Sequence, residues 1–301
     1  MSQGYLNRRI LLGAAFAAPF VLSVSRQAFA ASPTRIVALD LLATEVLLTL
    51  GITPPAIANR ALYQRLVAEP ELPPTVEDLG PLTEPNAEYL QILRPELIVL
   101  SAWQASALGR LSEIAPLHVL QSPARNVPAV SYATDVTREL GNVTGRSTEA
   151  DQWIERTALA LAEAKKALSD RSITPLYICR FAANGRNVAV FGGNGMIGDV
   201  LRQVGLTNAW QGRVNASGVV SVGIDQLAGD PDARIVHFDR GAETKQALSR
   251  LEQSPLWNAL PAVRAKRVTA MPVIYPSGGL FSAARFARQL VSFLPARENH
   301  G

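Results

Sequence analysis

A pattern of strand and helix segments occurs twice along this chain, and the repetition limits the folds that the chain can adopt. Residues 45–53 are echoed 154 residues later by residues 199–207, and residues 93–99 are echoed 136 residues later by residues 229–236. A single echo could arise by chance, because leucine-rich helices resemble one another. Two echoes in the same order predict two similar α/β lobes.

Short apolar runs alternate with helical segments within the first half of the chain. The run 35–39 is apolar and β-branched, which predicts a buried strand, and residues 44–50 predict a helix that stops at Gly51. A further helix at 85–93 precedes a strand at 97–100. Strands that alternate with helices favour parallel pairing. The predicted fold class is therefore α/β, with two Rossmann-like lobes whose sheets are rich in parallel strands.

Residues 147–169 differ from both lobes and predict one long helix. Apolar side chains recur at helical spacing along this segment, from Trp153 to Leu168. About 20 helical residues span ~30 Å, which is enough to connect two lobes. We therefore assign an N-terminal lobe to residues 31–146, an interlobe helix to 147–169 and a C-terminal lobe to 170–301. The alternative is an ordinary helix that packs on the first lobe alone.

Residues 1–30 have the three parts of a cleavable export signal. Arg8 and Arg9 provide a positive start, residues 10–24 form an apolar run, and residues 28–30 are a small-x-small cleavage site. The paired arginines favour the twin-arginine route. The alternative is an uncleaved membrane anchor, which is disfavoured because the run is shorter than the ~18–20 apolar residues that span a bilayer.

Charge and cysteine content exclude two further classes. Removal of the signal takes away three arginines and no acid, which lowers the formal net charge from +4 to +1. No cluster of Lys and Arg remains that could follow a phosphate backbone, so nucleic-acid binding is disfavoured. Cys179 is the only cysteine, so an internal disulfide is impossible. Its apolar neighbours predict a buried strand.

Residues that support catalysis or metal binding do not occur in suitable patterns. None of the three histidines is spaced with another His, Cys or acid as a metal site requires. No serine lies in a Gly-x-Ser-x-Gly motif. The glycines of residues 192–195 follow a predicted strand without the spacing of a phosphate loop, which favours a tight strand-to-helix turn. We expect a protein that binds without catalysis and carries no metal or cofactor of its own.

Several segments resemble one family of proteins. The similar segments are DLGPLTEPNAEYL at 78–90, LRPELIV at 93–99, NAWQG at 208–212, IDQL at 224–227 and PLW at 255–257. They resemble periplasmic binding proteins for siderophores and vitamin B12, and among these the iron(III)-hydroxamate-binding members most. The resemblance extends over essentially the whole mature chain. It implies two α/β lobes joined by one long helix, which is the helical-backbone or class III architecture.

The resemblance also implies a function. A monomeric periplasmic receptor would hold an iron(III)-siderophore, of hydroxamate type, in a shallow cleft between the lobes and deliver it to an ABC importer. Its partners would be the inner-membrane permease and the cytoplasmic ATPase, and iron would be bound only as part of the siderophore. The alternative is a carboxylate siderophore, haem or a corrinoid in the same architecture; Arg60 and Arg180 would suit an anionic ligand. A lobe-duplicated metallocofactor enzyme would need cluster-binding cysteines that one Cys cannot supply.

The ligand residues of the family are only partly present. A ligand arginine of the hydroxamate-binding members corresponds to Leu82, a ligand tyrosine to Gln104, and cleft tryptophans to Leu66, Ser217 and Tyr275. A siderophore presents oxygens around apolar methylenes, so its cleft needs aromatic walls and a few donors. The remaining ligand-binding candidates are Tyr63, Trp103, Gln104, Arg180, Phe181 and Tyr275.

Three charged residues lead to more specific hypotheses. Arg180 follows a buried strand, and we expect its donor fork to contact the oxygen-rich face of the iron complex, with a surface position as the alternative. Glu88 and Asp225 fall at comparable helix starts in the two lobes. The resemblance implies that these two acids dock arginines of the permease. The alternative is stabilisation of each helix N-terminus, worth about 0.3–1 kcal/mol.

Overall fold

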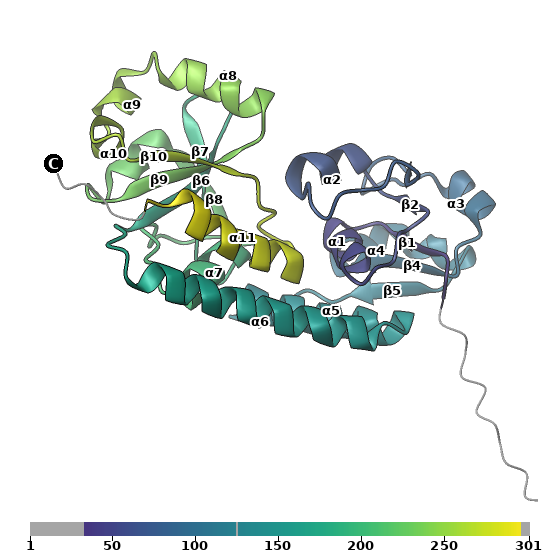
Figure 1. Ribbon diagram of the computed structural model, residues 1–301. Coiled ribbons are helices and arrows are strands. Elements are labelled where there is room, and N and C mark those ends of the chain that lie inside the picture. The colour runs from purple at the N-terminus through teal and green to yellow at the C-terminus, as the bar shows by residue number, and fades with distance from the viewer. Residues whose placement is uncertain (1–32, 125, 296–301) are drawn as a thin grey trace, which may run out of the picture. The chain divides into compact units, whose positions relative to one another are not determined.

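Two five-stranded sheets, each with helices on both faces, organise the chain (Figure 1). This computed structural model describes residues 33–124 and 126–295, which belong to one compact unit. The export signal predicted at residues 1–30 lies outside the described residues. Within the described ranges, no helix combines the length and the apolar character that a membrane crossing needs.

The N-terminal sheet is parallel throughout. Its strands are β1 Ile36–Ala38, β2 Ala56–Ile57, β3 Glu77–Asp78, β4 Leu97–Ser101 and β5 Leu117–Leu120. They lie in the order β3-β2-β1-β4-β5, with Ile36 opposite Leu97 and Ile98 opposite Leu117. The chain adds β2 and β3 on one side of β1 and then returns to the other side for β4. This reversal places a topological switch point between β1 and β4.

Helices cover both faces of this sheet. They are α1 Leu41–Thr49, α2 Arg60–Leu66, α3 Ala87–Leu93, α4 Ala102–Leu108 and the short 3-10 helix η1 Gly109–Glu113. Successive residues of β1 alternate between two cores, so that Ile36 and Ala38 face one core while Val37 faces the other. Asp40 begins α1 because its Oδ1 accepts the backbone N–H of Leu42 at 2.8 Å.

The C-terminal sheet contains one reversed strand. Its strands are β6 Leu176–Phe181, β7 Asn187–Phe191, β8 Val219–Gly223, β9 Arg234–Asp239 and β10 Val268–Pro272, in the order β10-β9-β6-β7-β8. The strands β6, β9 and β10 are parallel, whereas β7 is antiparallel to both β6 and β8. Only five residues separate β6 from β7, which is too short for a parallel crossover. The prediction of parallel-rich sheets is confirmed, with this hairpin as an exception.

The helices of this lobe also cover both faces of the sheet. They are α7 Met196–Gln203, η2 Ile224–Ala228, α8 Ala242–Leu251, α9 Pro255–Ala259, α10 Pro261–Arg264 and α11 Leu280–Phe293. The glycine-rich turn before α7 allows a close backbone approach: a Cβ on Gly195 would lie 2.6 Å from the Cα of Gly218. This contact supports the interpretation of residues 192–195 as a tight strand-to-helix turn. Cys179 is buried within β6, as its neighbours predicted.

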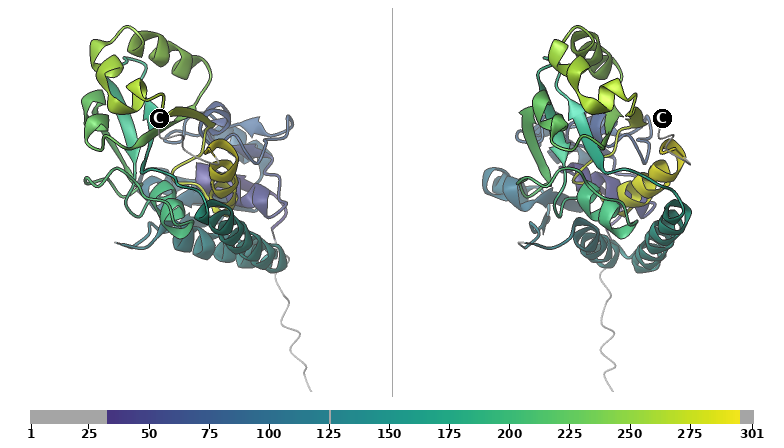
Figure 2. Two further views of the ribbon diagram at one scale, coloured as in Figure 1. Left: turned by 60° about the vertical axis from the view of Figure 1, so that its left-hand side comes forward. Right: turned by 90° about the vertical axis from the view of Figure 1, so that its left-hand side faces the viewer.

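The long helix expected between the lobes is α6 Ser147–Ser169, and it packs on both lobes. Ala150 near its start belongs to the N-terminal core, while Leu161 and Leu168 belong to the C-terminal core. A helix packed on the first lobe alone is therefore the wrong alternative. The sequence did not indicate that α5 Ala129–Thr144 runs beside α6 and likewise contributes to both cores (Figure 2).

Two buried acids connect helices across the junction of the lobes. Glu45 of α1 accepts the backbone N–H groups of Gly279 and Ser282, both at 2.9 Å, and the Ser282 hydroxyl at 2.8 Å, at the start of α11. Asp199 of α7 accepts the N–H of Val130 at 2.9 Å, at the start of α5. Glu45 and Asp199 occupy corresponding positions in the two sequence echoes. The same position of the two repeats thus holds the start of another helix. Glu45 of the N-terminal lobe holds α11 of the C-terminal lobe, and Asp199 of the C-terminal lobe holds α5, which extends into the N-terminal core.

Candidate ligand-binding site

A cavity of about 320 Å³ lies between the two lobes. From the N-terminal lobe it is lined by Asp40, two residues after β1, and by Ser101, the last residue of β4. From the C-terminal lobe it is lined by loops, including Asn194 before α7, Ser217 before β8 and Tyr275 after β10. Ligands of open α/β sheets bind outside the carboxyl ends of the strands at a topological switch point. The cavity occupies this position in the N-terminal lobe.

The cavity combines aromatic walls with hydroxyl and amide groups. Trp103 is 54% exposed at its mouth, and Tyr132 and Tyr275 line it from α5 and from the loop after β10. Burial, together with the carboxylates of Asp40 and Glu45, raises the pKa of Tyr275 well above its ordinary value. Burial also raises the pKa of Tyr132 to about 12. Both phenols therefore stay protonated at neutral pH.

Two of the predicted ligand residues, Trp103 and Tyr275, line this cavity. Ser217, at a position that corresponds to a cleft tryptophan of the family, lines it as well. Leu66, at another such position, and Leu82, at the position that corresponds to a ligand arginine, pack instead against the core of the N-terminal lobe. The site is therefore less aromatic than the resemblance implies, and it is built on both lobes.

The predictions for Tyr63 and Gln104 are wrong. Tyr63 has no exposed surface, and its hydroxyl donates to the carbonyl of Pro70 at 2.8 Å. Gln104 is buried at the first turn of α4, where its Nε2 donates to the carbonyls of Leu39 and Leu82, both at 2.8 Å. The hydrogen bonds of these polar groups are used within the lobe, so both side chains stabilise the fold and are not available to a ligand.

The prediction for Phe181 is also wrong, although its neighbour Arg180 remains a candidate. Phe181 is buried between His237 and Trp257, with ring centroids 5.0 and 5.2 Å away. Adjacent residues of a strand point to opposite faces of the sheet. Arg180 consequently points to the face that Ile178 shares, which is the face of the core formed with α5, α6 and α11. It lines a second hollow of about 380 Å³ and not the cavity itself.

The other charged candidates do not line the cavity. Arg60 donates to the carbonyl of Val76 at 2.7 Å and so is held by its own lobe. Glu88 and Asp225 are exposed in the first turns of α3 and η2, one on each lobe. Asp225 accepts a hydrogen bond from Gln226 at 2.8 Å. Neither acid lines the cavity, so any function of this pair concerns another surface.

Sequence reasoning missed several residues of the cavity. Asp40 and Ser101 carried a usable signal, because each polar residue directly follows an apolar run, 35–39 or 97–100, that predicts a strand of a parallel sheet. Tyr132 and Asn194 carried none, since they come from a helix and a loop whose approach to the cavity depends on packing. Across the described ranges, no group of three His, Cys, Asp or Glu side chains is placed to hold a metal ion.

Two α/β lobes joined by a helix, with a lined cavity between them, define a two-lobed solute-binding protein. The chain belongs to the periplasmic binding protein family, which it matches over residues 36–275. The members of this family are binding proteins. The match confirms the predicted family, and the two sheets of the structure confirm the predicted two-lobed fold.

Individual relatives extend over nearly the whole chain. The iron(3+)-hydroxamate-binding protein FhuD of Escherichia coli K12 is 32% identical over 286 residues, which are 95% of this chain and 95% of that protein. The Fe(3+) dicitrate-binding periplasmic protein FecB of the same strain is 26% identical over 268 residues, 86% of this chain and 84% of that protein. The crystal structure of FhuD from Vibrio cholerae with bound Fe3+-Desferal has a TM-score of 0.79 at 28% identity, and the match includes 86% of this chain and 97% of that one.

Proposed function

We propose that the protein binds a ferric siderophore in the interlobe cavity and passes it to an ABC permease. The observation that carries the proposal is the lining of the cavity. Trp103 and Tyr275 offer aromatic surface to the apolar methylenes of a chelate, and Ser101, Asn194 and the hydroxyl of Tyr275 offer hydrogen bonds to its oxygens. Iron would enter the site only as part of its chelate.

The relatives favour a hydroxamate ligand. A relative named for ferric hydroxamate is 32% identical to this chain, and one named for ferric dicitrate is 26% identical. A hydroxamate-type siderophore is therefore the first ligand to test, and a carboxylate siderophore is the alternative. Haem and a corrinoid are further alternatives for the same architecture. The role is binding without catalysis.

Delivery of the siderophore to the permease is proposed to require contacts from both lobes. Glu88 and Asp225 each expose a carboxylate on a different lobe, as docking to arginines of a membrane permease requires. The receptor would act as a monomer in the periplasm, after export by the predicted twin-arginine signal, and a cytoplasmic ATPase would drive uptake through the permease.

Native mass spectrometry and titration calorimetry against a panel of ferric hydroxamate, catecholate and carboxylate siderophores, haem and cobalamin test the ligand. We expect a one-to-one complex with at least one ferric siderophore. Trp103→Ala and Tyr275→Ala should each weaken that complex at least tenfold, equivalent to about 1.4 kcal/mol. Trp153→Ala is the matched aromatic control and should bind normally, because Trp153 of α6 packs against Phe281 of α11 and does not line the cavity. A protein that binds no chelate, or binds one equally well in all three variants, contradicts the proposal.

Iron uptake by cells that carry charge-reversed receptors tests docking. The double variant Glu88→Lys and Asp225→Lys should bind its chelate with unchanged affinity and fail to support uptake. Glu155→Lys reverses an exposed acid on α6 and should transport normally. Normal uptake with the double variant would refute docking through these residues.

A further inference from the structure

Arg180 lies on the C-terminal lobe beside the cavity, close enough to Arg65 of the N-terminal lobe for the two charges to interact. It is opposite Ala189 on β7, which is itself opposite Ser221 on β8, so these side chains share one face of the sheet. They line the second hollow together with Asn215 and Arg240. Ala216, the next residue after Asn215, lines the 320 Å³ cavity. The hollow and the cavity are therefore neighbours along one loop.

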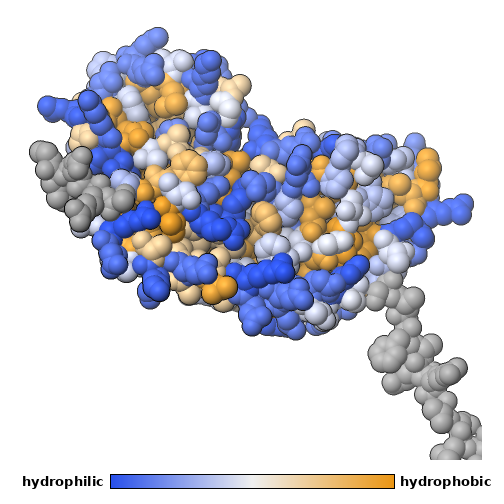
Figure 3. All heavy atoms as spheres, in the orientation of Figure 1, coloured by the Kyte–Doolittle hydropathy of each residue, from blue (hydrophilic) through white to orange (hydrophobic). Residues whose placement is uncertain are grey.

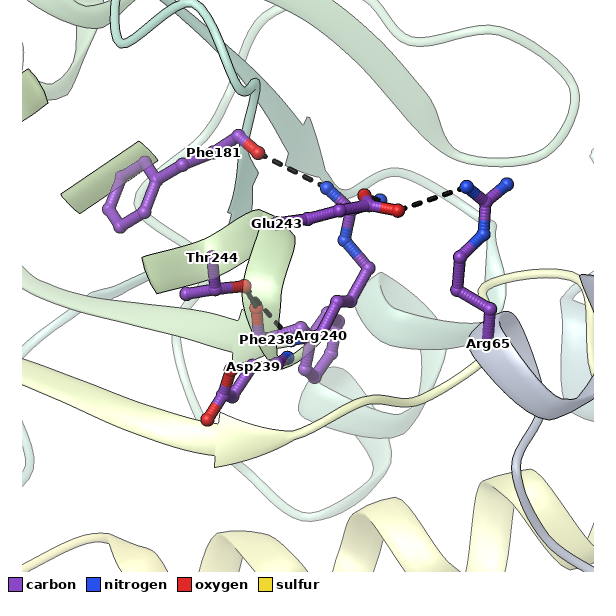
Figure 4. Close-up of polar contacts among 8 residues, drawn as sticks. Arg65, Phe181, Phe238, Asp239, Arg240, Glu243 and Thr244 are labelled. Atoms are coloured by element: carbon purple, nitrogen blue, oxygen red, sulfur yellow. Dashed lines mark hydrogen bonds and ion pairs between the residues drawn. The ribbon is translucent and has the colours of Figure 1, made fainter. Parts of the chain in front are cut away.

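Three arginines and one acid come together at this hollow. Arg65 of α2 forms an ion pair with Glu243 of α8 at 2.9 Å, which joins the two lobes, and Arg240 forms a second ion pair with the other oxygen of Glu243. Figure 4 shows Glu243 between the two guanidinium groups, with Arg240 also beside the carbonyl of Phe181. On the face shown in Figure 3, hydrophilic side chains gather at the notch between the lobes.

The positive charge at this place exceeds the negative charge. Arg180 forms no hydrogen bond or ion pair with any residue that the structure describes, and the buried Nε of Arg240 has no acceptor there either. The charged groups that influence Arg180 are two cations, Arg240 and Arg65, and one anion, Glu243. Burial and the charge of Arg240 lower the pKa of Arg180. A partly buried cation without a partner is costly, and an anion placed beside it would relieve the cost.

We propose that Arg180, flanked by Arg65 and Arg240, forms a subsite for a carboxylate of the chelate that occupies the cavity. The inference rests on the proposed function and narrows it to a ferric siderophore that combines its iron-binding groups with a free carboxylate. The guanidinium fork of Arg180 matches a carboxylate in two parallel hydrogen bonds. Arg65 and Arg240 are already held by Glu243, so they contribute mainly their charge. A neutral trihydroxamate complex would leave Arg180 without a partner.

Affinity for two chelates of different charge tests the subsite. The probes are ferrichrome, a neutral trihydroxamate complex, and ferric aerobactin, an anionic citrate-based dihydroxamate complex. Wild-type protein should bind ferric aerobactin more tightly than ferrichrome. Raising the salt concentration from 50 to 300 mM should strongly lower the affinity for ferric aerobactin alone, because salt screens the attraction between charges. Arg180→Gln should weaken ferric aerobactin at least tenfold and change ferrichrome by less than twofold. Arg180→Lys keeps the charge without the fork and should fall between.

Each outcome bears on either the subsite or the function. Arg138→Gln removes an exposed charge of α5 outside both hollows and should leave both affinities unchanged. Tight ferrichrome binding without a preference for ferric aerobactin, or an equal loss of both ligands in Arg180→Gln, overturns the subsite and leaves the proposed function standing. Binding of no ferric siderophore from the larger panel would overturn the function and the subsite with it. The salt dependence is measured on wild-type protein, so it decides the matter even where a variant fails to fold.

Discussion

Each lobe contains a buried acid that accepts hydrogen bonds from the start of a helix, but the two acids are stabilised by different partners. Each lobe places an acid at the same position of its repeat, Glu45 in α1 and Asp199 in α7, and each acid accepts hydrogen bonds from the start of another helix. Both side chains are buried. Asp199 also forms an ion pair with Arg202 at 2.6 Å. Glu45 instead accepts three hydrogen bonds from uncharged donors at the start of α11.

The difference shows how a buried carboxyl group can be stabilised without an ion pair. A helix N-terminus offers unpaired N–H groups and a positive end of the helix dipole. At Glu45 this stabilisation is incomplete: burial raises the pKa above its ordinary value, although the hydrogen bonds and the nearby Arg285 oppose the increase. The junction at α11 should therefore respond to pH through Glu45.

The largest expected effect comes from removal of the two acids. Glu45→Ala leaves two buried N–H groups without acceptors and opens a small cavity, so we expect a loss of about 3 kcal/mol in the free energy of unfolding. Asp199→Ala should cost about 2 kcal/mol, since fewer buried donors lose their acceptor. Urea denaturation followed by circular dichroism measures both losses.

Glu155→Ala, on the exposed side of α6, is the control and should change stability by less than about 0.5 kcal/mol. If Glu45→Ala were no more harmful than this control, the hydrogen bonds to α11 would not stabilise the junction. If Asp199→Ala were the more harmful of the two, the contrast between the lobes would be reversed.

A smaller effect is expected from pH. A carboxyl group whose pKa is raised by folding favours the folded state most below its unfolded pKa, and this contribution is lost as the pH rises through the folded value. Relative to Glu45→Gln, wild-type stability should therefore be greatest below pH 4.5 and should decline above it. The glutamine can accept both N–H groups and donate to the Ser282 hydroxyl, as a protonated glutamate would. Denaturation midpoints of the two proteins between pH 3.5 and 8 provide the comparison, and a constant difference would contradict the raised pKa.

The smallest effect should come from the exposed link between the lobes. The ion pair of Arg65 with Glu243 is largely accessible to solvent, with 51% and 34% of the two side chains exposed. Exposed pairs are screened by water and salt, so Arg65→Gln should cost about 0.5 kcal/mol. A thermal shift assay at low and high salt measures this effect. A loss as large as that of Glu45→Ala would show that α2 and α8 hold the lobes together as much as the buried junction does.

The sequence predicted the elements better than the directions of individual side chains. The repeat, the long helix and the class of fold follow from apolar spacing, which is a local property of the chain. Arg180 and Phe181 are adjacent in the sequence, yet one faces the cleft and the other is buried beside His237. Strand alternation predicts that they differ, but only the pairing of β6 with its neighbours decides which of them faces the cleft.

The same limit applies to the polar candidates. Tyr63 and Gln104 have groups that could bind a siderophore, and nothing in their local sequence shows that carbonyls of the same lobe already accept their donors. Trp103 and Tyr275, which are predicted ligand residues, both line the cavity although they are 172 residues apart in the chain. Both positions were found from residue type and family resemblance, and their meeting in one cavity was found only from the structure.

The sequence by itself therefore determined the duplicated α/β fold, the helix between the lobes and the family, because the spacing of apolar residues and the characteristic motifs are local properties of the chain. The tertiary structure decided which groups meet between the lobes. The corresponding acids of the two repeats hold helices across the junction. Arg65 of α2 and Arg240 after β9 share the carboxylate of Glu243, and Arg180 of β6 lies near them without a partner of its own among the described residues. These arrangements depend on contacts between distant residues, whose packing no local pattern encodes.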